Sequence, residues 1–280
     1  MAKTILLVNR QTILVILLLS FAQLYCGAQS IPLVNGFAHN DYRHKRPLYD
    51  ALDNGFTNIE ADIHLKDSAL VVAHVFPSLH RERTLEKLYF KPLYDRVTLN
   101  KGQVYAGYNK PVILMIDIKT DANNTYKVLE RLLRKYRSML TTYANGAVVD
   151  GAVTVVLSGH KPYKLLEGEG SRLAFIDDDL RKVARDTVTR NVFTMASCKY
   201  SRLLSWKGKG AMPFLEKQRL CAFIAIAHSM GSKVRLWASP ESKPVWDELL
   251  RCGVDLINTD KLVTLRNYLS ANTAVLAKAD

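Results

Sequence analysis

Two carboxylates and a histidine lie close together in Asn58–His74, a stretch that begins as an apolar strand-like run. Side chains alternate between two faces in an extended strand, so Glu60 and Asp62 would share one side and Ile59 and Ile63 the other. Two like charges this close repel each other unless a cation or a basic group lies between them. A hard divalent metal, which prefers oxygen ligands, would suit the pair. The alternative is an amphipathic strand with one solvated face.

Further side chains of this kind stand at the ends of the neighbouring runs. The first run ends with His39, and the second is followed by His74. The third ends with Asp117, and Lys119 comes two residues later. Several carboxylates together would be costly without a cation, because each desolvated carboxylate disfavours its neighbours. The sequence therefore predicts one divalent cation, Mg²⁺ or Ca²⁺, held by Glu60, Asp62 and Asp117.

These residues predict acid/base chemistry on an anionic substrate. With a metal holding that substrate, one of His39 and His74 would activate a hydroxyl and the other would protonate the leaving oxygen. Lys119 would hold a further oxygen. This division of work suits phosphodiester cleavage, in which the metal neutralises the phosphoryl charge. Each residue also has a structural alternative, since a lone histidine is often a hydrogen-bonded core residue and Asp117 with Lys119 would form a rim ion pair.

Eight apolar strand-like runs alternate with helical patterns and would position these side chains. The runs are Val34–His39, Asn58–Leu65, Val112–Ile118, Val153–Ser158, Leu173–Asp178, Val192–Ser197, Lys233–Ser239 and Asp255–Asp260. The clearest helical pattern covers Val128–Tyr143, where apolar residues fall on one stripe. Eight β/α units predict an α/β fold, a single (β/α)8 TIM barrel, with its chemistry at the carboxyl ends of the strands. A doubly wound open sheet is the alternative.

Length and composition favour one folded domain. The chain has 280 residues, of which 48% are hydrophobic and 23% charged, and this excludes a disordered protein. No linker, low-complexity tract or internal repeat interrupts the chain after residue 30. The longest break in the β/α pattern, residues 75–111, would either shape a substrate pocket or pack as a helix across the barrel end.

The first 28 residues read as a signal peptide. Lys3 and Arg10 precede an apolar run, Ile13–Leu19, and small residues around Cys26 form a candidate cleavage site. We therefore expect export, by secretion or to a periplasm, and a single barrel domain over residues 29–280. An uncleaved anchor is one alternative. Lipid attachment through Cys26 is another, which the bulky Tyr25 fits poorly.

The strong positive charge predicts anionic partners. The formal net charge is +13, and removal of residues 1–28 takes away two basic residues and no acid, which leaves +11. For an exported protein, phospholipid headgroups, phosphodiesters or acidic polymers fit this balance better than nucleic acid does. Residues 199–209 mix four basic residues with Tyr200 and Trp206, as either a lipid-facing segment or a solvated loop. We expect a monomer with a small-molecule or lipid phosphodiester substrate and an anionic membrane surface as a further partner.

At these residues the sequence resembles the phospholipase-C-like phosphodiesterase superfamily. That superfamily includes glycerophosphodiester phosphodiesterases, phosphatidylinositol-specific phospholipases C and the sphingomyelinase D toxins of spiders. The resemblance covers most of residues 34–270, and its pieces are FAHNDY at 37–42, IEADIHLKDSALVVAH at 59–74, LMIDIK at 114–119, and VRLWASPESKPVWDELLRCGVDLINTD at 234–260. It implies a TIM barrel of this type, with a metal on Glu60, Asp62 and Asp117 and acid/base roles for His39 and His74. It also implies substrate contacts by Asn40, Lys119 and Trp237.

Several residues depart from the pattern of glycerophosphodiesterases. Asn40-Asp41 follows His39 where Arg-Gly is typical, Asp117 replaces a glutamate, and Val75 replaces an aspartate after His74. The HNDY sequence resembles a poorly characterised branch, so glycerophosphodiester specificity is a default.

Together these features predict a phosphoric diester hydrolase, exported and metal-dependent, that acts on a glycerophosphodiester or phospholipid-type substrate by hydrolysis or through a cyclic phosphate. A non-catalytic barrel that binds phospholipid headgroups is the alternative. Two other barrel hydrolases fit less well: an amidohydrolase needs His-x-His on the first strand, and a retaining glycosidase draws its two acids from separate strands.

Overall fold

The structure is a computed structural model that describes residues 30–75, 80–183 and 192–276, with side chains of the last helix described as far as Ala271. The chain divides into a short unit, Met1–Ile31, and a long unit, Pro32–Asp280, and the fold below is that of the long unit. The predicted signal peptide, residues 1–28, lies outside the described residues. Among the helices that the structure describes, none combines the length and the apolar character that a membrane span requires.

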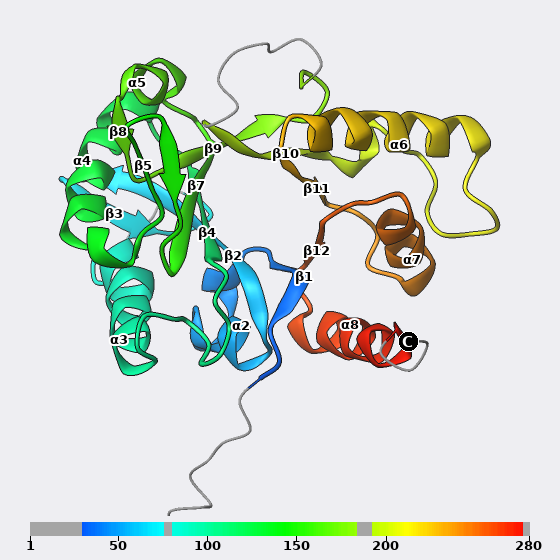
Figure 1. The fold of residues 1–280 in the computed structure, drawn as a ribbon, viewed down its shortest axis with the longest axis horizontal. Coiled ribbons are helices and arrows are strands. Elements are labelled where there is room, and N and C mark those ends of the chain that lie inside the picture. The colour runs from blue at the N-terminus through cyan, green and yellow to red at the C-terminus, as the bar shows by residue number, and fades with distance from the viewer. Residues whose placement is uncertain (1–29, 76–79, 184–191, 277–280) are drawn as a thin grey trace, which may run out of the picture. The chain divides into compact units, whose positions relative to one another are not determined.

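Eight parallel strands close into a barrel (Figure 1). Each strand pairs with the next around the ring, and β1 closes it by pairing with both β12 and β2. All eight predicted runs are barrel strands, so the (β/α)8 prediction is confirmed and the open sheet is excluded. One further strand, β3 (Ala69–Val72), pairs antiparallel with β2. The barrel strands are β1 (Leu33–Ala38), β2 (Phe56–Lys66), β4 (Val112–Ile118), β7 (Val153–Gly159), β9 (Phe175–Asp179), β10 (Phe193–Lys199), β11 (Lys233–Trp237) and β12 (Leu256–Thr259).

Helices connect the strands on the outside of the barrel (Figure 1). The α-helices are α2 (Tyr49–Asp53), α3 (Lys91–Leu99), α4 (Ala122–Lys135), α5 (Tyr163–Gly168), α6 (Phe214–Ser229), α7 (Lys243–Arg251) and α8 (Leu262–Leu276). Single turns occur at η1 (Asp41–Arg43), η2 (Glu86–Phe90), η3 (Arg137–Met139) and η4 (Tyr200–Arg202). A separate antiparallel sheet joins β5 (Thr142–Ala144), β6 (Ala147–Val149) and β8 (Ser171–Arg172).

The helix predicted at Val128–Tyr143 is α4, which begins six residues earlier and ends eight residues earlier than predicted. Asp121 caps its start, since its carboxylate accepts a hydrogen bond from the Asn124 amide at 2.8 Å. The helix ends at Lys135, and Tyr143 belongs to strand β5 instead. The apolar stripe continued past the real helix end because the next segment also buries apolar side chains against the barrel, so periodicity alone misplaced both ends.

The apolar core has two parts, one outside the barrel and one inside. The outer part fills the space between strands and helices and includes Leu114 and Ile116 of β4. The alternate residues of the same strand, Ile113 and Met115, point into the barrel. The inner apolar cluster consists of Phe37, Ile113, Met115, Val156, Met195 and Leu256. Polar side chains replace this cluster at the carboxyl ends of the strands, so the closed barrel presents its interior chemistry on that face.

Candidate active site

A pocket of about 510 Å³ opens at the carboxyl ends of the barrel strands. Its lining comes from seven of the eight strands or the turns that follow them. The pocket brings together all eight of the site residues expected from the sequence, which are His39, Asn40, Glu60, Asp62, His74, Asp117, Lys119 and Trp237. The structure brings these residues together, and their chemical roles stay predictions.

Three carboxylates form the centre of the pocket. Asp62 of β2 and Asp117 of β4 are paired in the parallel register of the two strands, and Glu60 lies two residues before Asp62 on the same face. Oxygen atoms of the three side chains all lie within 4.8 Å of one another. Glu60 and Asp62 are buried and Asp117 is half-buried. Strand pairing thus creates the cluster, since the register places carboxylates from two strands side by side.

Protein donors occupy one oxygen of each carboxylate in the contacts that the structure describes. Arg235 contacts Glu60 Oε2 at 3.2 Å, and Lys119 Nζ lies 2.9 Å from Asp117 Oδ2 and 3.2 Å from Asp62 Oδ2. The other oxygen of Asp117, Oδ1, is buried and has no hydrogen-bond partner among the described residues. A buried carboxylate oxygen without a donor is costly, so this atom fits the role of a ligand to a cation.

The carboxyl end of β7 leaves room beside that oxygen only because residue 159 is glycine. Gly159 has a φ of +69°, in the left-handed region, and a Cβ built there would lie 2.0 Å from Asp117 Oδ1. Any larger residue would displace the carboxylate. The glycine therefore keeps Asp117 in the cluster.

The residues present fit a hard divalent cation. Among the described residues, Lys119 and Arg235 are the lysine and arginine that form ion pairs with the three carboxylates of the cluster and with Asp177. Burial raises the pKa of Glu60 and of Asp177, because a desolvated carboxylate is disfavoured. A cation with oxygen ligands would relieve this cost, and Glu60, Asp62 and Asp117 are the residues that would hold it.

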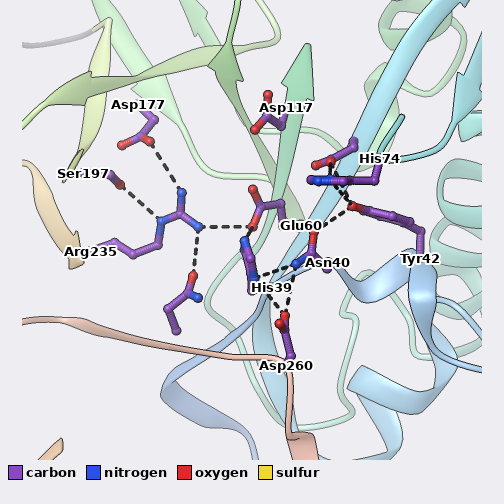
Figure 2. A network of polar contacts seen from close by, with 12 residues as sticks. His39, Asn40, Tyr42, Glu60, His74, Asp117, Asp177, Ser197, Arg235 and Asp260 are labelled. Carbon is purple, nitrogen blue, oxygen red and sulfur yellow. Dashed lines mark hydrogen bonds and ion pairs between the residues drawn. The ribbon is translucent and has the colours of Figure 1, made fainter. Parts of the chain in front are cut away.

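His39 is held by a carboxylate on its far side (Figure 2). Its Nδ1 lies 2.8 Å from Asp260 Oδ1, and its Nε2 lies 3.7 Å from Glu60 Oε2. Burial acts to lower the pKa of His39, but the Asp260 hydrogen bond and the Glu60 charge outweigh it and raise the pKa. The Asn40 amide donates to the same Asp260 oxygen at 3.2 Å. Asp260 therefore orients the ring so that Nε2 faces the carboxylate cluster.

His74 is tied to the cluster itself (Figure 2). Its Nδ1 lies 2.9 Å from Asp62 Oδ2, while about half of its side chain is exposed. The Tyr42 hydroxyl lies 2.8 Å from the same oxygen and 2.7 Å from Asn40 Oδ1, either of which can accept its single proton. Burial raises the pKa of Tyr42, so it stays a neutral donor. This arrangement would leave Nε2 of His74 for the proton exchange predicted from the sequence.

Arg235 organises the opposite side of the pocket, and the sequence analysis missed it. Its guanidinium is buried, stacks over Phe37 at 4.2 Å, and lies 3.9 Å from Asp177 besides contacting Glu60. It also bonds to Ser197 and Asn258 at 3.2 and 3.1 Å. Arg235 lies two residues before Trp237 on the same strand face, so period-two alternation from Trp237 would have found it.

Asp260 and Tyr42 were also missed as site residues. Asp260 is the last residue of the eighth predicted strand, and Tyr42 lies within the FAHNDY motif, so the position of each could have indicated a site residue. Position alone was insufficient, because hydrogen bonding to a histidine depends on which strands are neighbours. Asp260 meets His39 only because β12 and β1 are neighbours in the closed barrel.

The described part of residues 75–111 does not line the pocket but contacts residues next to it, through Tyr89 and Asp41. None of its described residues lines the pocket, so the pocket-shaping alternative is wrong for this part of the chain. Tyr89 donates to Asp41 Oδ2 at 2.9 Å, and the Leu48 amide donates to the same oxygen at 2.5 Å. Leu48 has a φ of +67°, so Asp41 holds a strained turn next to His39.

Comparisons with known proteins identify similar sequences and a similar fold. The sequence matches the family described as the AIM6-like phosphodiesterase domain over residues 28–177. Proteins named "Altered inheritance of mitochondria protein 6" match at 31% identity over 265 residues in Eremothecium gossypii and 29% over 272 residues in Lachancea thermotolerans. A homologue in Arthroderma benhamiae is 27% identical over 260 residues. The Eremothecium match covers 82% of the present chain and 68% of the relative, and the Lachancea match covers 80% and 63%. The Arthroderma match covers 82% of each.

A solved structure shares the fold. The crystal structure of a glycerophosphodiester phosphodiesterase from Parabacteroides distasonis aligns with a TM-score of 0.50 at 13% identity. The alignment covers 87% of the present chain and all of that chain. At this identity the likeness concerns the barrel alone.

Proposed function

Because the chain belongs to the family of AIM6-like phosphodiesterase domains, we propose that it is a metal-dependent phosphodiesterase acting on a glycerophosphodiester or phospholipid-type substrate. One observation carries the proposal: two histidines, each bound through Nδ1 to a carboxylate, share a pocket with three carboxylates whose oxygens lie within 4.8 Å. Such an arrangement supplies both a proton donor and a proton acceptor beside a cation site.

The chain's own side chains divide the reaction among them. Asp260 orients His39 and Asp62 orients His74, so both Nε2 atoms are available for proton transfer at the substrate. Burial acts to lower the pKa of Lys119, but Asp117 and Asp62 raise it, so the ammonium stays charged and can contact a phosphoryl oxygen. A divalent cation, when bound, supplies neutralisation of phosphoryl charge.

A panel assay with metal control tests the proposal. Glycerophosphodiesters, lysophospholipids, sphingomyelin and phosphatidylinositol are each incubated with Mg²⁺, Ca²⁺ or EDTA, and products are read by phosphorus NMR, which also distinguishes a cyclic phosphate from hydrolysis. We expect turnover of at least one class and its loss in EDTA. Binding of phospholipid headgroups without any release of product would instead support a non-catalytic barrel.

Histidine substitutions test the assigned roles. We expect His39→Ala and His74→Ala each to lower turnover by about 10²- to 10⁴-fold with unchanged circular dichroism. His228→Ala is the matched control, because His228 also lies 2.8 Å from a carboxylate, Asp255, but does not line the pocket. Near-normal turnover in either pocket variant would refute the assignment.

Export forms part of the proposal and rests on residues 1–28 alone. We expect protein recovered from outside the cytoplasm to begin close to residue 29, which intact-mass measurement reads directly. A recovered mass that retains residues 1–28 would contradict cleavage.

A further inference from the structure

A basic segment with two exposed apolar side chains runs from the last residue of β10 into the first turn of α6. We name residues 199–215 the α6 entry segment. It carries four basic residues and no Asp or Glu, and all four basic side chains, Lys199, Arg202, Lys207 and Lys209, are exposed. It ends with Phe214 and Leu215, which are 75% and 69% exposed. Two adjacent, strongly exposed apolar residues at the end of a segment whose charged residues are all basic require an explanation.

The α6 entry segment lies on the same face of the barrel as the pocket. In a β/α barrel each helix begins on the face where the preceding strand ends, so Phe214, the first residue of α6, lies on the pocket face. Lys199 and Arg202 line the pocket itself. Gly208 packs against the start of α7, where a Cβ would lie 3.1 Å from Val245. Figure 1 shows the segment in yellow beside α7.

Hydrogen bonds hold the segment in one shape. The Glu216 carboxylate accepts bonds from the Ser205 and Trp206 amides at 3.0 and 3.1 Å and from the Ser205 hydroxyl. Trp206 is buried, and its Nε1 donates to the Lys209 carbonyl at 3.0 Å. The Tyr200 hydroxyl donates to the Trp206 carbonyl at 2.7 Å. A preorganised segment loses little conformational entropy when it binds.

The combination of charges and apolar side chains selects the partner. A second copy of the chain would bring four positive charges against four, which opposes self-association through this surface. A soluble anion would contact the lysines but would leave Phe214 and Leu215 in water. An anionic lipid bilayer satisfies both, because its headgroups attract basic side chains and its interface buries apolar ones.

We propose that the α6 entry segment docks the pocket face onto an anionic phospholipid bilayer, with Phe214 and Leu215 inserted at the interface. This role goes beyond the proposed phosphodiesterase activity and does not depend on it. Docking would bring the pocket mouth to the headgroup layer, since Lys199 and Arg202 belong to both surfaces.

Vesicle co-sedimentation of the whole protein tests the proposal. We expect binding to vesicles of phosphatidylcholine with phosphatidylserine and much weaker binding to phosphatidylcholine alone. Each lysine near an anionic surface contributes about fivefold to the partition coefficient, so Lys207→Gln with Lys209→Gln should lower it about 25-fold. Phe214→Ser with Leu215→Ser should lower it at least about tenfold.

Two double variants from the opposite barrel face serve as matched controls. Lys101→Gln with Lys110→Gln removes the same charge from exposed positions, one after α3 and one before β4. Val148→Ser with Val149→Ser removes an exposed apolar pair, 45% and 64% exposed, from β6. Both controls should bind vesicles within about threefold of the wild type.

The outcomes separate docking from activity. Raising ionic strength from about 0.1 M to about 1 M shortens the screening length from about 10 Å to about 3 Å and should release the protein. Absence of binding by the wild type, equal binding to both kinds of vesicle, or equal loss in test and control variants would each overturn the proposal. Failure of the phosphodiesterase assay leaves this binding experiment unaffected, because it measures no turnover.

Discussion

Replacing Arg235 by methionine tests whether one buried guanidinium holds the inner pocket together. Arg235 is only 3% exposed and lies 3.2 Å from Glu60 and 3.9 Å from Asp177, both also buried. Methionine keeps much of the volume over Phe37 but removes the charge. The two carboxyl groups would then remain buried without the guanidinium that they share. Removing one partner of a buried ion pair is costly because it leaves an uncompensated buried charge.

The expected loss is large relative to the stability of a domain. Removing one partner of a buried ion pair costs about 3–5 kcal/mol, against a typical total of about 5–15 kcal/mol. Burial already raises the pKa of Glu60 and Asp177, and losing Arg235 would raise both further. A carboxyl group whose pKa is higher in the folded protein than in the unfolded chain stabilises the fold below its unfolded-state pKa. This stabilisation is lost as the pH rises through its folded-state pKa. The deficit of Arg235→Met should therefore grow from about pH 4 to pH 8.

Urea unfolding in EDTA at both pH values measures this difference without compensation by an added cation. Arg134→Met is the control, because Arg134 pairs with Glu130 on the exposed side of α4, where solvent screens the charges and such a pair contributes little to stability. If Arg235→Met loses no more stability than the control, or loses the same amount at both pH values, the electrostatic account of the inner pocket is wrong.

Three further predictions concern the turns and partners around the site. Gly159→Ala should weaken Mg²⁺ or Ca²⁺ binding at least about tenfold in calorimetric titration, because its Cβ would displace Asp117; undiminished affinity would contradict the cluster. Burial raises the pKa of Asp41 to about 6 from 3.8, so its stabilising effect is present below about pH 4 and lost by about pH 6. The stability of Asp41→Asn relative to wild type should accordingly rise by roughly 2 kcal/mol from pH 4 to pH 7 in urea unfolding, and a constant difference would refute this. Asp260→Asn should lower the pKa of His39 in an NMR titration, and an unchanged value would show that Asp260 does not control it.

Local patterns in the sequence predicted the strands well because barrel strands are short and apolar. The run Val112–Ile118 matches β4 at both ends, and each of the other seven runs overlaps its strand. The helix pattern at 128–143 was less reliable, because apolar side chains beyond Lys135 serve a turn and a strand that pack on the same barrel. Periodicity reports which side is buried and does not report where a helix ends.

The candidate site divides in the same way. Alternation placed Glu60 and Asp62 on one face, and the ends of the strand-like runs pointed to His39, His74 and Asp117. These five and the other three expected residues all line one pocket. Arg235 escaped because a basic residue inside a strand usually indicates a solvated face. Only the closed barrel brings it to Glu60, 175 positions away in the chain.

The sequence by itself determined which side chains share a strand face and which ones end a strand, because both follow from alternation within a few residues. The tertiary structure alone decided which strands are neighbours and in what register. That register sets Asp62 beside Asp117 and Asp260 beside His39, and ring closure surrounds Glu60 with protein. Burial and the distance between charges are properties of the closed barrel, so the pKa shifts and the unpartnered oxygen of Asp117 emerge only with the fold.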